Sequence, residues 1–198
     1  MPNLSLAARA DTFRSILAST QVTDDRTNRI DVEEAIARLM DLLRDVRNRK
    51  ASLYIVGNGG SAAVASHSVV DFLKVGGIRA FTLTDVSVLT AMANDVSYAE
   101  SFEQVLDVHT LPGDALIAIS SSGNSMNIVN AAAKVKSLDG TVVTLSGFAP
   151  DNPLRARGDL NVWVDSRDYG MVEAAHQFIL HVLIDRLWHE RDAAKMRP

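Results

Sequence analysis

A serine-rich segment at residues 119–125, Ile-Ser-Ser-Ser-Gly-Asn-Ser, carries four hydroxyl groups within six residues. It follows the apolar run 115–118 and precedes a helical pattern that begins near Met126. A loop between a strand and a helix can bind anions, because the first backbone N–H groups of the helix are unpaired and its dipole favours negative charge. Gly123 lets the backbone approach a ligand, and the loop has no acidic side chain. The segment predicts a phosphate site; an ordinary turn with a serine N-cap is the alternative.

Two pairs of polar residues lie on predicted helices that are otherwise apolar. His67 and Asp71 are four residues apart and therefore share a helix face. Glu173 and His181 lie in the predicted final helix, where His181 stands among apolar neighbours. Two imidazoles and two carboxylates can bind a metal through nitrogen and oxygen, or act as acid and base. A structural histidine–aspartate contact explains the first pair equally well from its spacing alone.

A glycine-rich segment at residues 57–61, Gly-Asn-Gly-Gly-Ser, follows the apolar run 53–56. It matches neither the dinucleotide fingerprint nor the Walker loop, so by itself it predicts only a tight strand–helix turn. This segment, the serine-rich segment and Asp85 each follow a predicted strand. A parallel sheet places the carboxyl ends of its strands at one edge, where such folds bind ligands. We therefore expect all three to converge on one crevice.

Short apolar strands alternate with helices along most of the chain, which is typical of a parallel sheet covered by helices on both faces. We predict one α/β domain over residues 1–198, with a five-stranded parallel sheet flanked by helices. The predicted strands are 53–56, 81–83, 115–118, 141–145 and 160–164, the last at an edge. The predicted helices among them are 62–73, 87–94, 98–108, 126–136 and 170–191.

Two leading helices are predicted within residues 1–50, before the first strand. Residues 4–17 carry a loose apolar stripe, and a second helix follows a capping box formed by Asp31 and Glu34. The polar segment 23–28 between them is predicted to be a turn. Because these helices lie outside the strand–helix alternation, we expect them to pack on the sheet or on a partner subunit.

The overall composition excludes several classes of protein. The net charge is −4 and no basic run is present, which argues against direct binding of nucleic acid. No cysteine is present, so disulfides and thiolate metal sites are excluded. We find neither a signal-peptide pattern nor a membrane-spanning segment, and therefore expect a cytoplasmic protein with no membrane partner.

Taken together, these motifs resemble the sugar isomerase (SIS) domain, and most closely the phosphoheptose isomerases. Enzymes of that family convert sedoheptulose 7-phosphate to D-glycero-D-manno-heptose 7-phosphate. The resemblance covers nearly the whole chain, including the leading helices. It implies a homotetramer with active sites at subunit interfaces and one zinc ion per subunit, without an organic cofactor. The likeness rests on the order and spacing of residues 57–61, His67, residues 94–95, residues 120–125 and His181.

The resemblance also assigns binding residues, position by position. The phosphate would be held by Ser120, Ser121, Ser122 and Ser125. The sugar would contact Asn58, Gly59, Gly60, Asp71, Asn94, Asp95 and Glu173. The metal ligands would be His67, Asp71, Glu173 and His181.

Two of the implied metal ligands depart from the family pattern. Asp71 stands where the isomerases carry a glutamate, and its shorter side chain sets the carboxylate back by about 1 to 1.5 Å, a displacement that matters for catalysis. Glu173 stands where they carry a glutamine, so the ligand set is more anionic. The extra carboxylate favours a divalent cation.

The leading functional expectation is aldose–ketose isomerisation of a sugar phosphate through an enediol(ate). Asp71 and His181 are the expected catalytic acid/base pair, and the metal would polarise the substrate oxygens. The alternative is a non-catalytic SIS protein, either an adaptor that binds the replication initiator or a sugar-phosphate sensor. Histidines at both matching positions, with a carboxylate at each of the other two, favour the enzyme.

Overall fold

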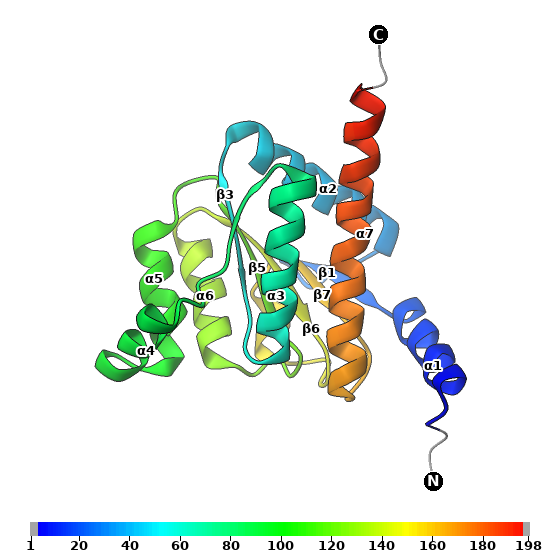
Figure 1. Cartoon of the computed structure of the whole chain (residues 1–198). Helices are drawn as coiled ribbons and strands as arrows, with labels where there is room; N and C mark the ends of the chain where they lie inside the picture. The colour runs from blue at the N-terminus through cyan, green and yellow to red at the C-terminus, as the bar shows by residue number, and fades with distance from the viewer. Residues whose placement is uncertain (1–3, 196–198) are drawn as a thin grey trace.

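The computed structural model describes residues 4–195, which form a seven-stranded sheet between helices (Figure 1). The strand order is β2-β1-β7-β6-β5-β3-β4. The strands are β1 (Gln21–Asp24), β2 (Arg29–Ile30), β3 (Ser52–Val56), β4 (Arg79–Phe81), β5 (Ala115–Ser120), β6 (Thr141–Ser146) and β7 (Leu160–Trp163). The α-helices are α1 (Leu6–Ala18), α2 (Val32–Arg49), α3 (Gly60–Asp71), α4 (Val86–Asp95), α5 (Ser101–His109), α6 (Met126–Ser137) and α7 (Tyr169–Lys195). A π-helix (Phe72–Gly76) continues α3, and 3-10 helices span Tyr98–Glu100 and Pro153–Ala156.

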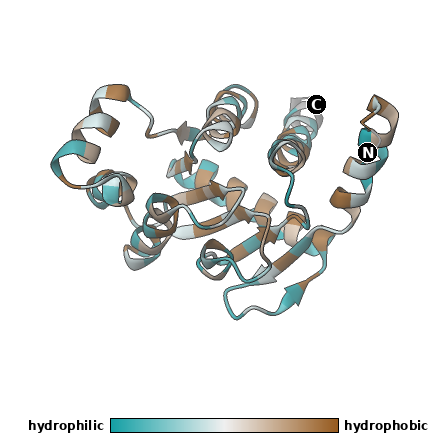
Figure 2. Cartoon of the chain, turned by 90° about the horizontal axis from the view of Figure 1, so that it is seen from below, coloured by the Kyte–Doolittle hydropathy of each residue, from teal (hydrophilic) through white to brown (hydrophobic). Residues whose placement is uncertain are grey.

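Helices cover both faces of the sheet, as a predominantly parallel sheet requires. Along β3, Leu53 and Ile55 point into a core formed with α2, α3 and α7. Tyr54 and Val56 point to the opposite face, into a core formed with α5 and α6. Figure 2 shows the apolar strands lying between these helices. The predicted α/β class and the helix-flanked sheet are confirmed.

The predicted number of strands is wrong, because the segment before α2 adds two strands to the sheet. β1 and β2 form an antiparallel hairpin, and β1 pairs antiparallel with β7. β7 is therefore an interior strand and not the predicted edge. The Asp24 carboxylate accepts hydrogen bonds from the N–H groups of Arg26 and Asn28, so the predicted turn is present but shorter than expected. Its polar residues concealed the short strands on either side.

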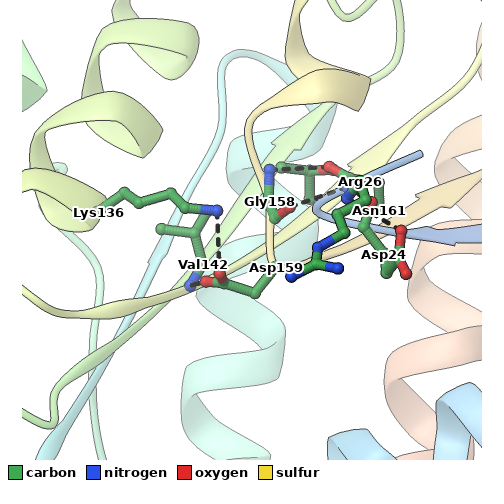
Figure 3. A network of polar contacts seen from close by, with 8 residues as sticks. Asp24, Arg26, Lys136, Val142, Gly158, Asp159 and Asn161 are labelled. Carbon is green, nitrogen blue, oxygen red and sulfur yellow. Dashed lines mark hydrogen bonds and ion pairs between the residues drawn. The ribbon is translucent and has the colours of Figure 1, made fainter. Parts of the chain in front are cut away.

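Asn161 on β7 holds this hairpin to the parallel part of the sheet (Figure 3). Its side chain is buried, and Nδ2 donates to the carbonyl oxygens of Asp24 on β1 (3.3 Å) and Gly158 (2.9 Å). Oδ1 accepts from Thr144 on β6 (2.7 Å) and from the Gly158 N–H (2.8 Å). One amide thus joins β1, β6 and the turn that precedes β7.

The two leading helices pack differently from each other. Apolar residues of α2 enter the sheet core, and Asp31 caps the helix by accepting hydrogen bonds from the N–H groups of Glu33 and Glu34. Helix α1 contains no buried residue and contacts α7 at the side of the sheet (Figure 1). Its Phe13 ring meets the Phe178 ring with centroids 6.2 Å apart.

No helix formed by residues 4–195 combines the length and hydrophobicity needed to span a bilayer.

Candidate functional site

The serine-rich loop connects β5 to α6 and is held in a fixed shape by its own hydroxyl groups. Ser120 Oγ donates to Ser125 Oγ at 3.2 Å and accepts from the Gly123 N–H at 3.2 Å. Gly123 has a positive φ of 68°, and a methyl group there would collide with the buried side chain of Asn152. Glycine is therefore required at this position for both its backbone conformation and its size.

The glycine-rich loop meets the serine-rich loop, as the sequence predicts, and together they line a cavity of about 240 Å³. Helices α3 and α6 both begin at this cavity, and neither has a side chain that caps its first N–H groups. Ser121 Oγ is buried beside the cavity without a hydrogen-bond partner. The cavity is lined by Asn58, Gly59, Gly60, Ser61, Ser120, Ser121, Ser122, Ser125, Tyr169 and Glu173. Among the described residues, no lysine or arginine lines it, so an anion there would be held by helix N-termini and hydroxyls.

Glu173 lies in this cavity, against the first residue of α3. A methyl group at Gly60 would collide with both carboxylate oxygens of Glu173. A carboxylate beside a helix N-terminus is stabilised by the helix dipole. Glu173 precedes His181 by two turns of α7, a separation of about 12 Å along the helix axis. The structure therefore places Glu173 with the serine-rich loop.

The other three predicted metal ligands come together between α3 and α7. His67 Nε2 lies 3.2 Å from Asp71 Oδ2, and His181 Nδ1 lies 3.7 Å from the same oxygen. The two imidazole rings meet edge to face, with centroids 5.1 Å apart. A cavity of about 350 Å³ opens onto these residues and is also bordered by Trp188.

The His67–Asp71–His181 cluster fits a divalent cation. The three potential ligand atoms lie within 4.8 Å of one another. Asp71 Oδ2 is buried and accepts no hydrogen bond of suitable geometry, even from His67 Nε2 at 3.2 Å, whereas a buried carboxylate oxygen normally has a donor. Two nitrogens and one carboxylate oxygen are ligands that zinc accepts, with one position left for a water or substrate oxygen.

Three further predicted residues lie away from both cavities. Asn94 and Asp95 are at the exposed end of α4, where Asn94 Nδ2 donates to Asp95 Oδ1 at 2.8 Å. We expected Asp85 to lie in the crevice with the two loops, and this prediction is wrong. Its carboxylate instead caps α4 by accepting hydrogen bonds from the N–H groups of Ser87 and Val88, both at 3.0 Å.

A network around Asn58 was missed by the sequence reasoning. Asn58 and Asn127 exchange two amide hydrogen bonds, of 2.9 and 3.0 Å. Tyr98 Oη donates to Asn58 Oδ1 at 2.8 Å. The available signal was a polar residue, Asn127, in the first turn of α6, but its partner is 69 residues away in sequence. The network fixes the orientation of the Asn58 amide.

His176 lies on α7 between Glu173 and His181, but unlike them it is fully buried. Its Nε2 lies 3.2 Å from the Ser146 carbonyl oxygen. Burial lowers the pKa of His176 to about 4, so the ring is neutral at physiological pH. His176 therefore has a structural role.

Comparison with known proteins shows similarity in both sequence and fold. Residues 20–147 match the family model of the SIS domain. A phosphoheptose isomerase from Helicobacter pylori is 33% identical over 160 residues, covering 78% of this chain and 83% of that protein. One from Mycobacterium tuberculosis is 32% identical over 185 residues, covering 88% and 90%. The solved structure of a phosphoheptose isomerase from Neisseria gonorrhoeae superposes with a TM-score of 0.79 at 26% identity, covering 92% of this chain and 96% of that chain.

Proposed function

This chain belongs to the SIS domain family and is a sugar-phosphate isomerase, and we propose that it interconverts sedoheptulose 7-phosphate and D-glycero-D-manno-heptose 7-phosphate. The relatives in Helicobacter pylori and Mycobacterium tuberculosis are named phosphoheptose isomerase, which supports a seven-carbon substrate. The initiator-binding adaptor is not favoured, because His67, Asp71 and His181 lie together as a potential reactive centre.

The observation that carries this proposal is the placement of two different sites along one pair of helices. Helices α3 and α7 pack together (Figure 1). The serine-lined cavity lies at the start of α3, and the histidine cluster lies further along the same helix. His67 follows Gly60 by seven residues, which is about 10 Å along a helix axis. An extended heptose phosphate is roughly as long, given carbon–carbon bonds of about 1.5 Å. The phosphate would bind at the serine loop while the carbonyl end reaches the cluster.

Isomerisation requires a group that removes a proton beside the carbonyl and a group that returns it at the neighbouring carbon. We propose Asp71 and His181 as this acid/base pair, with Asp71 Oδ2 and His181 Nδ1 3.7 Å apart. His67, Asp71 and His181 would hold zinc, which when bound supplies Lewis-acid polarisation of the carbonyl and hydroxyl oxygens. We propose that Glu173 contacts the sugar from its position in the serine-lined cavity.

We further propose the homotetramer that the family resemblance implies. Asn94 and Asp95 are exposed and lie outside both cavities of their own chain. An interface active site would let them contact the sugar bound to a neighbouring subunit. Light scattering of the purified protein, combined with titration of active sites, tests this arrangement.

The first experiment combines metal analysis with turnover of sedoheptulose 7-phosphate. We expect about one zinc per subunit and formation of the heptose phosphate. His181→Ala should abolish turnover, while His189→Ala, a matched change at an exposed position of the same helix, should leave it unchanged. Unchanged turnover in His181→Ala would remove this residue from the mechanism. Bound metal without turnover would direct attention to other ketose phosphates.

A further inference from the structure

A third cavity, of about 460 Å³, lies towards the opposite end of the sheet from the serine-rich loop. It is bordered by the start of β3, by β4 and the two residues that follow it, and by the end of α5 and the turn that precedes β5. The serine-rich loop follows the other end of β5, about 17 Å away along a six-residue strand. This cavity shares no lining residue with the serine-lined cavity. We call this one the amino-end cavity.

The charged groups of the amino-end cavity favour an anion. Arg49, Lys50 and Arg79 line it, and Asp114 is its acidic residue. Both carboxylate oxygens of Asp114 are already used, accepting hydrogen bonds from the N–H groups of Ser52 (2.7 Å) and Leu111 (2.9 Å). Asp114 is also buried, and these two hydrogen bonds hold its carboxylate in place. The cationic side chains are left to interact with a ligand.

Two of these cations are held in place by the fold. Arg79 Nη1 donates to the Lys50 carbonyl oxygen at 2.8 Å. The guanidinium of Arg49 packs directly over Gly113, where any side chain would collide with it. Arg49 also pairs with Asp45 at 3.1 Å, but that pair is exposed and therefore weak. The cavity thus presents positioned guanidinium groups, which suit phosphate oxygens.

Two aromatic residues form another part of the wall, beside aliphatic residues that include Leu83, Leu111 and Pro112. The rings of Tyr54 and Phe81 lie 6.0 Å apart between centroids, inclined at 32°, and the Arg79 guanidinium lies 6.0 Å from the Phe81 ring. Phe81 is 41% exposed, so part of its ring is free to contact a ligand. Within residues 4–195, no strand pairs with the outer side of β4, so its backbone groups can hydrogen-bond to a ligand.

We propose that the amino-end cavity binds a nucleoside phosphate, with the base against Phe81 and the phosphate at Arg49 and Arg79. A sugar phosphate would use the guanidinium groups but would leave the aromatic wall without a matching partner. A cavity of this volume falls in the range of small-ligand sites and suits one free nucleotide. This site is separate from the isomerase centre, and the inference does not depend on the identity of the sugar substrate.

The test is isothermal titration calorimetry of the full-length protein with ADP, and separately with adenosine and inorganic pyrophosphate. We expect saturable binding of ADP, and at least tenfold weaker binding of adenosine and pyrophosphate, because each lacks one of the two recognised parts. Phe81→Leu and Arg49→Gln should each weaken ADP binding at least fivefold and leave sugar-phosphate turnover unchanged. Arg38→Gln is the matched control, because it breaks a similar exposed ion pair on α2 outside the cavity.

Three results would overturn the proposal. The first is absence of saturable binding at about 10 mM ADP, which excludes dissociation constants of about 1 mM or tighter. The second is equal binding of ADP and pyrophosphate, which would leave the aromatic wall without a role. The third is binding that survives both cavity variants but is lost in Ser121→Ala, which would place ADP at the serine-rich loop. Thermal melts of Phe81→Leu and Arg49→Gln check that each variant is folded.

Discussion

Ser121 has an unpaired buried hydroxyl, so stability and ligand binding should respond differently to its removal. Truncating a buried group that makes no hydrogen bond costs little, and we expect Ser121→Ala to change the free energy of unfolding by less than about 1 kcal/mol. The same change removes a donor from the proposed phosphate site and should raise KM for the sugar phosphate about tenfold.

Urea denaturation and steady-state kinetics of the same preparation measure these two effects. Ser137→Ala, an exposed serine at the end of α6, is the control. A large loss of stability with unchanged KM would assign Ser121 to the fold and contradict a ligand role.

His176 makes the stability of the protein depend on pH. Its pKa is about 4 in the folded state against an ordinary value of 6.5, so between these values the unfolded chain binds a proton that the folded chain does not. Above pH 6.5 the His176 ring is neutral in both states and does not affect stability. As the pH falls from 6.5 towards 4, protonation of the unfolded chain increasingly destabilises the folded state. From pH 7.5 to pH 5 the loss is about 2 kcal/mol. Urea denaturation at both values should show a smaller loss in His176→Gln, and an equal loss would contradict the assignment.

At the residue scale, the sequence identified the two loops and the candidate site residues but not their hydrogen-bond partners. The serine-rich and glycine-rich segments do meet, because the carboxyl ends of parallel strands share an edge of the sheet. The Asn58–Asn127 contact joins residues of different βα units, and its hydrogen bonds follow from side-chain orientation that no local pattern encodes. The separation of Glu173 from His181, in contrast, follows from residue spacing, because eight residues of one helix span about 12 Å along its axis.

At the element scale, the first residue of α3, Gly60, lies directly against the carboxylate of Glu173 in the serine-lined cavity. Gly60→Ala should displace the Glu173 carboxylate, because the new methyl group would occupy its position. Alanine is a better helix former than glycine, so we expect the fold to be retained. If Glu173 contacts the sugar, kcat/KM should fall about tenfold, and the change should be smaller when Glu173→Ala is already present.

Kinetics of the two single variants and the double variant measure this coupling. Additive losses would show that Gly60 and Glu173 act independently, and would contradict the proposed contact.

Element boundaries were predicted well where capping and hydrophobic periodicity agree, as at Asp31 for α2. They were predicted poorly where tertiary pairing decides the structure. The four-residue strand β1 has no alternating pattern long enough to detect, and it exists because β7 offers a partner. The π-helix after Asp71 has no sequence signal that we used. Such turns are often found at functional sites, and this one adjoins the histidine cluster.

At the scale of the whole molecule, Asn161 links the hairpin to the parallel sheet. Asn161→Ala removes hydrogen bonds to Asp24, Thr144 and Gly158 and takes this partner from the buried groups of Thr144 and Gly158. We expect the free energy of unfolding to fall by about 2 to 4 kcal/mol. Urea denaturation measures this loss, and hydrogen exchange should show faster opening of β1.

Asn28→Ala in the same hairpin is the control, since its side-chain contact with Asp24 is exposed and should contribute at most about 1 kcal/mol. Equal effects of the two variants would contradict the special role of Asn161.

The serine-lined cavity carries no lysine or arginine among the described residues, and this has a consequence for the kinetics of substrate capture. Long-range attraction between opposite charges accelerates association and is suppressed by salt. A cavity that holds phosphate through hydroxyls and helix N-termini attracts it only at short range, and the molecule as a whole is negatively charged. The enzyme should therefore select its substrate after collision, by the fit of the phosphate among fixed hydrogen-bond donors. Its rate of encounter should therefore not fall as the ionic strength rises, because no described lysine or arginine of this cavity supplies an attraction for salt to screen.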